Sequence, residues 1–430
     1  MPLYSDVHFA VLEMLADCGC VSRPMFELLD YNYYYLTRSV KTLLDTDAIR
    51  KYGKGQKKHY ALNLAGRNRL AAYNPLRFSA SVLEFNKQIS QHPDRAMLSG
   101  DIAALLSCAG YGVHPDDKPV LPAITEILPA QPDHGHFVSL CRNTARRVYP
   151  DVDDRRTYIK RLSAIGCFYD ARIIKALLPK HAKMDNEGIN YARARGVLMT
   201  PDYLLRVYHS RDVALKFQKT GERNFRIRIL GSEMFQGFRP GNTDAILVCG
   251  YGFEAACHII GLSLDGLGTQ LAYYGKKTKV GTDADGERKI TVGERLTPSN
   301  LGNPSFYLPL DANGMAMASL FQYPAWERMM NREISRQVYG IEQEKSFYEV
   351  ADRKVFVLAS LNMTAIERAF HHIRTQDNPV TVICLNWQEP LFRNILTPIR
   401  NCDIVVKLMP GGFVEELAGK LDEYWRWQSS

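Results

Sequence analysis

The stretch that most constrains the fold is residues 31–64, where a helical pattern is followed directly by two short strand patterns. The apolar side chains of its first half recur at near-helical spacing, so we expect them to face the protein interior: Tyr35, Leu36, Val40, Leu43 and Leu44. The opposite face carries side chains that can donate hydrogen bonds: Tyr34, Thr37, Arg38 and Lys41. The pattern therefore predicts a helix with one packed face and one polar face.

The two strand patterns after this helix enclose a short basic turn. Residues 48–52 and 59–64 predict the strands, and the segment between them contains glycines and the lysines Lys54, Lys57 and Lys58. A helix followed by a basic hairpin is typical of a winged-helix module, in which the helix enters the major groove and the wing contacts flanking phosphates. The predicted DNA-binding residues are Tyr34, Thr37, Arg38, Lys41, Lys54, Lys57 and Lys58. The alternative is a solvated helix beside a lysine-bearing turn.

Two further helices are predicted upstream. Ser5 can cap a helix over residues 6–16, and Ser22 can cap a second over residues 23–29, with Pro24 in its first turn. The expected order is helix, extended link, helix, helix, strand, wing, strand.

The end of this region carries a motif. Residues 60–70, Tyr-Ala-Leu-Asn-Leu-Ala-Gly-Arg-Asn-Arg-Leu, resemble the Y-x-L-T-x-x-G-R-x-x-L pattern of many winged-helix proteins, including the replication-relaxation family of plasmids and conjugative elements. Asn63 stands where the pattern has threonine. The resemblance spans residues 5–73 and implies DNA binding, but it implies nothing about the rest of the chain. It places these residues where they would contact DNA: Arg38, Lys41, Lys54, Lys57 and Lys58.

Length, charge and cysteine content limit the possible domain number, partners and compartment. A chain of 430 residues predicts two or three domains, and its 54 basic against 46 acidic residues give a net charge of +8, which mildly favours a polyanionic partner.

No apolar run is long enough to span a membrane, and the start lacks a basic segment followed by an apolar one, so we expect a cytoplasmic protein without membrane contact. The nine scattered cysteines predict reduced thiols, and Cys18-Gly-Cys20 lacks a second pair at zinc spacing. We therefore predict no metal and no cofactor.

The expected domains are a winged helix over residues 1–73, a helical connector over 74–190 and an α/β domain over 191–430. The connector contains two helical patterns, residues 80–90 and 95–109. A basic face is expected on the connector from Arg142, Arg146 and Arg147, although a solvated arginine cluster explains them equally well.

The last third of the chain alternates between short apolar strands and helices. The predicted strands are residues 306–310, 354–358, 380–385 and 403–408, and the predicted helices are residues 312–321, 364–375, 390–399 and 412–425. This alternation predicts a three-layer α/β domain with a largely parallel sheet. Before it we expect a β-hairpin over residues 196–208, a strand over 244–249 and an exposed β-ribbon within 273–292.

This domain contains candidate residues for three kinds of chemistry. A metal-dependent nuclease needs converging carboxylates, but the candidates Asp202, Glu222, Asp244, Glu287 and Asp352 show no acid-x-lysine triplet on a strand. Gly250-Tyr-Gly252 between a strand and a helix gives a weak nucleotide-binding signal that a tight turn also explains. Cys384 lies in an apolar strand, which disfavours a reactive thiol, and the adjacent His371 and His372 point to different sides of a helix.

The sequence thus predicts a DNA-binding protein acting in replication, mobilisation or transcriptional regulation of a plasmid or conjugative element, with a non-catalytic α/β domain. Its expected partners are double-stranded DNA and replication or mobilisation proteins, and a homodimer remains an open alternative. The competing hypotheses are a metal-dependent nuclease that the winged helix directs to DNA, and a protein-interaction adaptor whose winged helix does not meet DNA.

Overall fold

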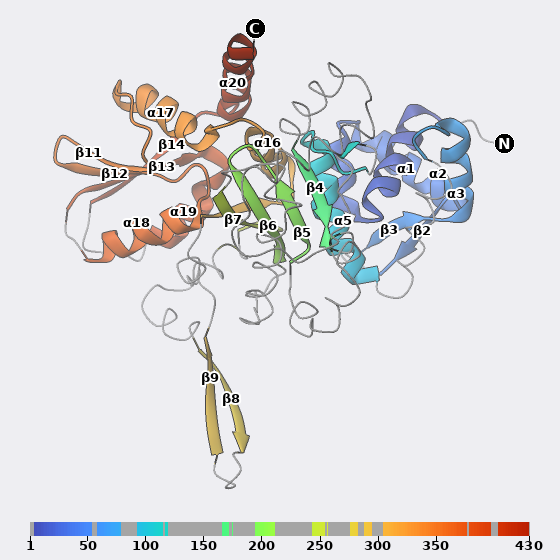
Figure 1. The fold of residues 1–430 in the computed structure, drawn as a ribbon, viewed down its shortest axis with the longest axis horizontal. Coiled ribbons are helices and arrows are strands. Elements are labelled where there is room, and N and C mark those ends of the chain that lie inside the picture. The colour runs from blue at the N-terminus through green and yellow to red at the C-terminus, as the bar shows by residue number, and fades with distance from the viewer. Residues whose placement is uncertain are drawn as a thin grey trace, which may run out of the picture.

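The computed structural model has a mixed α/β fold (Figure 1). It describes residues 4–53, 58–78, 93–114, 117–118, 166–171, 174, 194–210, 243–253, 256, 276–282, 288–294, 304–375, 378–396 and 403–429.

The N-terminal unit, residues 4–78, combines four helical segments with a small antiparallel sheet. The helical segments are α1 (Asp6–Cys18), the 3-10 helix η1 (Arg23–Leu29), α2 (Tyr33–Asp45) and α3 (Leu64–Tyr73). The strands are β1 (Cys20–Ser22), β2 (Ile49–Tyr52) and β3 (His59–Leu62), in the order β1-β3-β2. Buried residues from all three longer helices and η1, including Leu12, Phe26, Leu36 and Leu70, form its core. The predicted order of helices and strands is confirmed here.

Helix α5 (Pro93–Cys108) joins this unit to the rest of the protein. It packs on β1, α1 and η1 on one side and on β4, β6 and α16 on the other. The backbones come very close, because a Cβ built on Gly100 would lie 1.8 Å from the carbonyl oxygen of Cys20. The helix predicted over residues 95–109 is therefore present, but residues 80–90 and the arginines 142, 146 and 147 lie outside the described residues.

The central sheet contains five strands. They are β4 (Cys167–Asp170), β5 (Gly196–Met199), β6 (Tyr203–Ser210), β7 (Thr243–Gly250) and β10 (Ser305–Pro309), in the order β10-β7-β6-β5-β4. The pairs β4/β5 and β5/β6 are antiparallel, whereas β6/β7 and β7/β10 are parallel. The hairpin predicted over residues 196–208 and the strand over 244–249 are both confirmed.

A second sheet contains β11 (Phe347–Val350), β12 (Arg353–Val357), β13 (Val380–Leu385) and β14 (Ile404–Met409) in chain order. The pairs β12/β13 and β13/β14 are parallel, and β11/β12 is antiparallel. Two helices precede these strands, α16 (Ala312–Leu320) and α17 (Trp326–Tyr339). Three more lie between or after them: α18 (Met363–Thr375), α19 (Glu389–Leu396) and α20 (Phe413–Ser429). In Figure 1, α17 and α20 lie above this sheet and α18 and α19 below it.

The predicted alternation of parallel strands with helices is confirmed, but its assignment to one sheet is wrong. The strand predicted at residues 306–310 is β10, which pairs with β7 in the central sheet, while the other three predicted strands form the second sheet. An isolated bridge pairs Phe306 of β10 with Asn362 in the loop between β12 and α18, and the backbone N–H of Tyr307 donates to the carbonyl oxygen of Leu361 in the same loop. Pairing partners depend on contacts that are distant along the chain, which a local apolar pattern does not encode.

A cluster of aromatic rings fills the core between β10, α16 and α17. Trp326 is fully buried, and its ring centroid lies 4.4 Å from that of Phe321 and 5.6 Å from that of Phe306. Buried aromatic rings at these distances contribute strongly to packing.

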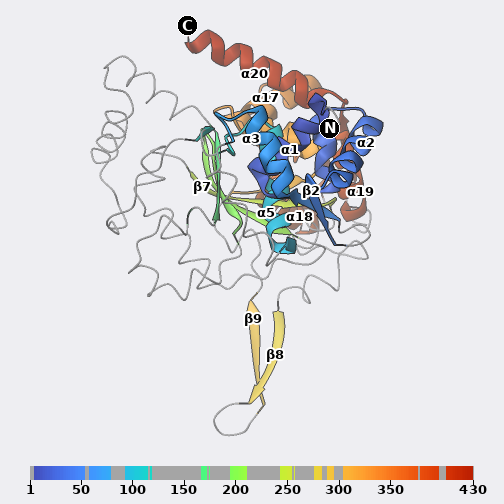
Figure 2. The ribbon, with the colours of Figure 1, turned by 90° about the vertical axis from the view of Figure 1, so that its right-hand side faces the viewer.

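The strands β8 (Lys276–Thr282) and β9 (Arg288–Glu294) pair with each other as an antiparallel ribbon that projects from the body of the molecule (Figures 1 and 2). The predicted ribbon is therefore present, with its turn outside the described residues. None of the described helices combines the length and the apolar character needed to cross a membrane.

Candidate nucleic-acid interface

Helix α2 presents a polar face to solvent. Tyr34, Thr37, Arg38 and Lys41 are all exposed, as predicted. The opposite face packs inward through three fully or nearly buried apolar side chains: Leu36, Val40 and Leu43. One expectation is wrong, because Tyr35 is 60 % exposed. It lies about a quarter turn from the packed face, so its ring remains outside the core.

Arg23, which the sequence did not single out, extends this face. Its guanidinium donates to the hydroxyl of Thr37 at 2.9 Å and lies 5.5 Å from the ring centroid of Tyr33. Its backbone N–H donates to the carbonyl oxygen of Lys58 at 3.3 Å. Arg23 therefore adds a cation to α2 and links this helix to the end of the basic hairpin.

The hairpin adds further positive charge. Lys58 is exposed beside β3, and Arg50 and Lys51 are exposed on β2. Lys54 and Lys57 lie outside the described residues, so the structure does not place these two predicted contacts. The basic surface is defined by Arg23, Arg38, Lys41, Arg50, Lys51 and Lys58.

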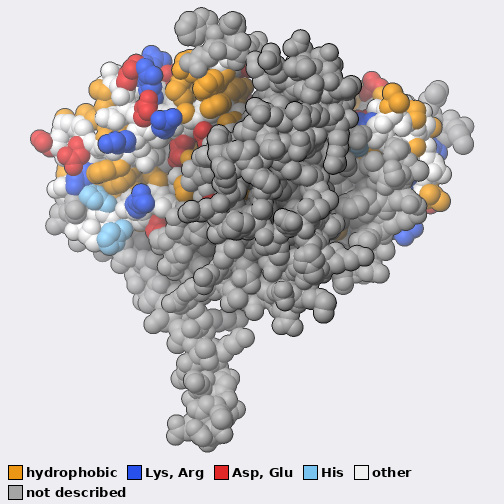
Figure 3. Space-filling view, viewed as in Figure 1, with side chains coloured by type: hydrophobic (Ala, Val, Ile, Leu, Met, Phe, Trp, Pro, Cys, Tyr) orange, Lys and Arg blue, Asp and Glu red, His pale blue; other side chains and the backbone are white. Residues whose placement is uncertain are grey.

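The basic surface belongs to one end of the molecule. Figure 2 turns this end toward the viewer, with α1, α2, α3 and β2 in front, and Figure 3 shows basic and hydrophobic side chains at the right-hand edge. Helix α2 packs on α1, η1 and β2 through its apolar side, which leaves its polar side available. Cations around an exposed helix face are suited to bind the phosphates of nucleic acid.

The carboxylates proposed for a nuclease have other contacts. Asp202 accepts a hydrogen bond from the backbone N–H of Ala325 at 2.6 Å, and Asp244 pairs with the buried Arg206 at 3.2 Å. Asp352 is exposed in a turn before β12, and Glu222 and Glu287 lie outside the described residues. Within the described ranges, no group of three or more His, Cys, Asp or Glu side chains could hold a metal ion.

The Gly250-Tyr-Gly252 turn connects different parts of the protein. Tyr251 donates a hydrogen bond to the carboxylate of Asp101 in α5, and the backbone N–H of Ser22 donates to the same carboxylate at 2.7 Å. The next residues contact the C-terminal half, since the carbonyl oxygen of Gly252 accepts a hydrogen bond from the hydroxyl of Tyr307 and Phe253 stacks on Trp387. The glycines thus shape a turn that links the N-terminal unit, the central sheet and the second sheet.

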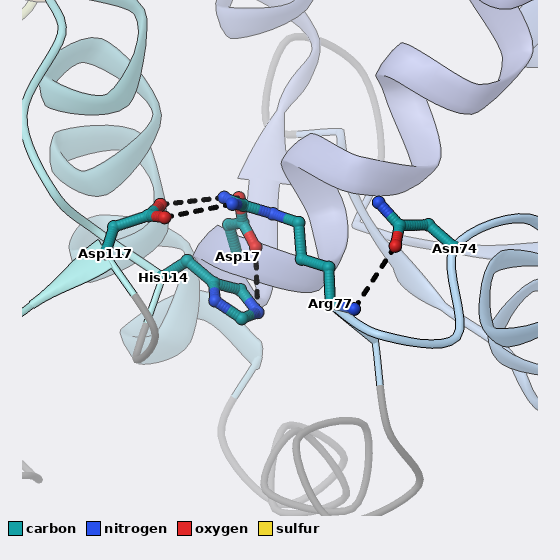
Figure 4. Close-up of polar contacts among 5 residues, drawn as sticks. All are labelled: Asp17, Asn74, Arg77, His114 and Asp117. Carbon is teal, nitrogen blue, oxygen red and sulfur yellow. Dashed lines mark hydrogen bonds and ion pairs between the residues drawn. The ribbon is translucent and has the colours of Figure 1, made fainter. Parts of the chain in front are cut away.

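A second polar cluster fastens the N-terminal unit to the segment after α5 (Figure 4). The guanidinium of Arg77 donates to both carboxylate oxygens of Asp117, at 2.8 and 3.0 Å, and to Asp17 at 3.3 Å. His114 is fully buried, and its Nε2 atom lies 3.8 Å from Asp17. Burial raises the pKa of Asp17 to about 6, although Arg77 opposes the rise.

Neither the thiol nor the adjacent histidines form a reactive site in the described part of the chain. The described cysteines are free thiols, and burial raises the pKa of Cys384 to about 12. His372 packs against the rings of Phe347 and Phe356, while His371 is exposed, so the two histidines do point to different sides.

We expect Asp101 to make stability depend on pH. Burial raises its pKa to about 6, above the unfolded value of about 4, so the folded state binds the proton more tightly. This stabilising contribution is present at low pH and is lost as pH rises through about 6. Asp101→Asn keeps the side-chain shape without ionising. The free energy of unfolding of this variant, relative to that of the wild type, should therefore increase by about 3 kcal/mol as the pH rises from about 4 to about 7.

Urea titrations of both proteins across this pH range measure that difference. Asp17 titrates in the same range but is common to both proteins, so their difference isolates Asp101. Parallel stability profiles would contradict the expected role of the buried carboxyl group.

In comparisons with family models, curated proteins and solved structures, the chain matches none of them.

Proposed function

We propose that the N-terminal unit is a winged-helix module that binds double-stranded DNA, with α2 directed to the major groove and the β2/β3 hairpin beside the phosphates. The protein would act in replication, mobilisation or transcriptional regulation of a plasmid or conjugative element. The two C-terminal sheets would serve DNA or protein contact.

The observation that carries this proposal is the outer face of α2. Its apolar side chains are buried on one side, and Tyr34, Arg38 and Lys41 are exposed on the other. Arg23 and Lys58 add positive charge from neighbouring elements. A packed helix with a basic outer face and a basic hairpin beside it is the arrangement that winged-helix proteins use on duplex DNA.

The order of elements also supports the proposal. Helix, strand, helix, helix and a two-stranded hairpin follow one another, and the three strands form an antiparallel sheet. Within the motif over residues 60–70, Gly66 lies at the contact between α3 and the chain before β2, where a Cβ would come 2.1 Å from the carbonyl oxygen of Ala48. Close packing between α3 and Ala48 therefore requires glycine at this motif position. The motif as a whole resembles that of the replication-relaxation family.

Salt dependence tests the proposal. Contacts to about five phosphates would release counterions and give a slope of about −4.5 in a plot of log affinity against log salt concentration. Fluorescence anisotropy with a labelled duplex measures this slope, and the same samples with magnesium or manganese should leave the DNA uncut. Absence of binding at low salt, or a slope near zero, would refute the proposal, and metal-dependent cleavage would favour a nuclease.

A further inference from the structure

Four tyrosines gather at the start of α2. Tyr33, Tyr34 and Tyr35 are 65, 66 and 60 % exposed, and Tyr31 just before them is 38 % exposed. They are four of the twelve exposed large hydrophobic residues in the described part of the chain, and they fall within five positions. We call Tyr31, Tyr33, Tyr34 and Tyr35 the tyrosine patch.

The patch does not belong to the core of its own helix. The packed face of α2 is formed by Leu36, Val40 and Leu43, and the helix start is fixed instead by Asn32, whose side chain accepts a hydrogen bond from the backbone N–H of Tyr34 at 2.9 Å. Tyr34 and Tyr35 meet edge to face at 5.9 Å between ring centroids. The rings are therefore held in place while much of their surface stays open to solvent.

Positive charge surrounds the patch. The guanidinium of Arg23 lies 5.5 Å from the ring centroid of Tyr33 and is itself held by the hydroxyl of Thr37. Arg38 lies one helical turn after Tyr34 on the same exposed face, and Lys41 follows it. Aromatic rings on which bases stack, flanked by cations that bind the backbone, are the pairing that recognises single-stranded nucleic acid.

Duplex DNA can bind the cations of this surface but offers no free base face to its tyrosine rings. In a duplex the base faces are stacked on each other, so a groove offers base edges and phosphates but no free face to a ring. An unpaired base exposes its face and can stack on an open aromatic ring.

We infer that the tyrosine patch binds unpaired bases, so that the N-terminal unit prefers DNA in which a single-stranded segment adjoins a duplex. This inference rests on the proposed DNA-binding function and names its substrate class. The cations of α2 hold the duplex phosphates, and Tyr33 and Tyr35 stack on the bases beyond the duplex end.

The test compares a blunt duplex with the same duplex carrying a single-stranded tail, using the full-length protein and anisotropy at one salt concentration. We expect the tailed DNA to bind about tenfold more tightly. Tyr33→Leu with Tyr35→Leu removes two exposed rings that the duplex-binding proposal does not use, so it should abolish this preference while leaving blunt-duplex affinity unchanged. A fluorescent adenine analogue in the tail should be quenched by stacking on the wild-type protein and not on the double variant.

Tyr424→Leu, which replaces an exposed tyrosine on α20, is the matched control and should retain the preference. Equal affinity for blunt and tailed DNA, or an equal loss on both in the double variant, would overturn the inference while leaving the duplex-binding proposal intact. Failure of both DNAs to bind would overturn the proposed function and the inference together.

Discussion

Replacing Arg38 and Lys41 with alanine is expected to lower the affinity for duplex DNA on the order of a hundredfold. Both side chains are exposed on the polar face of α2, so their removal should not disturb the packing of Leu36, Val40 and Leu43. One contact to a base edge is worth about 1–3 kcal/mol, and each lost phosphate contact also reduces the salt slope by about one. Anisotropy titrations at several salt concentrations measure both quantities.

The matched control removes one arginine and one lysine from another surface. Arg368 in α18 and Lys345 before β11 are exposed in the C-terminal half, so their double alanine variant changes the net charge equally. It should bind DNA with nearly the wild-type affinity. Equal losses in the two variants would indicate a general charge effect, and an unchanged affinity after loss of Arg38 and Lys41 would favour a unit that contacts proteins.

Trp326→Ala is expected to destabilise the C-terminal part of the protein by about 3–5 kcal/mol. The indole is fully buried and stacks on Phe321 while contacting Phe306, so its loss leaves a cavity where α16, α17 and β10 meet. Urea unfolding followed by circular dichroism measures the loss.

Tyr34→Ala provides the comparison for this measurement. Its side chain is exposed, and a surface substitution of this kind changes stability by about 0.5 kcal/mol or less. If Trp326→Ala were as mild as Tyr34→Ala, the aromatic cluster would not be the packed core that its geometry describes.

Local patterns predicted most of the individual elements. The spacing of Leu36, Val40 and Leu43 fixed the packed face of α2, and continuous apolar runs such as residues 380–385 marked buried strands. Helix α17 was not predicted, although it has a buried stripe at Trp326, Met330 and Ile334. The many charged residues between these positions make the apolar spacing hard to recognise in the sequence.

The candidate interface was predicted only in part. Thr37, Arg38 and Lys41 follow from helical periodicity, which is a local property. Arg23 could not be assigned this way, because its role depends on a hydrogen bond to Thr37, fourteen residues later in the chain. Asp101 likewise acquires its environment from Ser22 and Tyr251, which are distant in sequence.

The turn at residues 250–253 has a mechanical consequence. The hydroxyl of Tyr251 is hydrogen-bonded to Asp101 of α5 and to Ser22 of β1, and Phe253 stacks on Trp387, which directly follows β13 of the second sheet. Such a shared anchor opposes independent swivelling of the two ends. A nucleic acid bound at the N-terminal unit would therefore keep a fixed orientation relative to the C-terminal half of the protein.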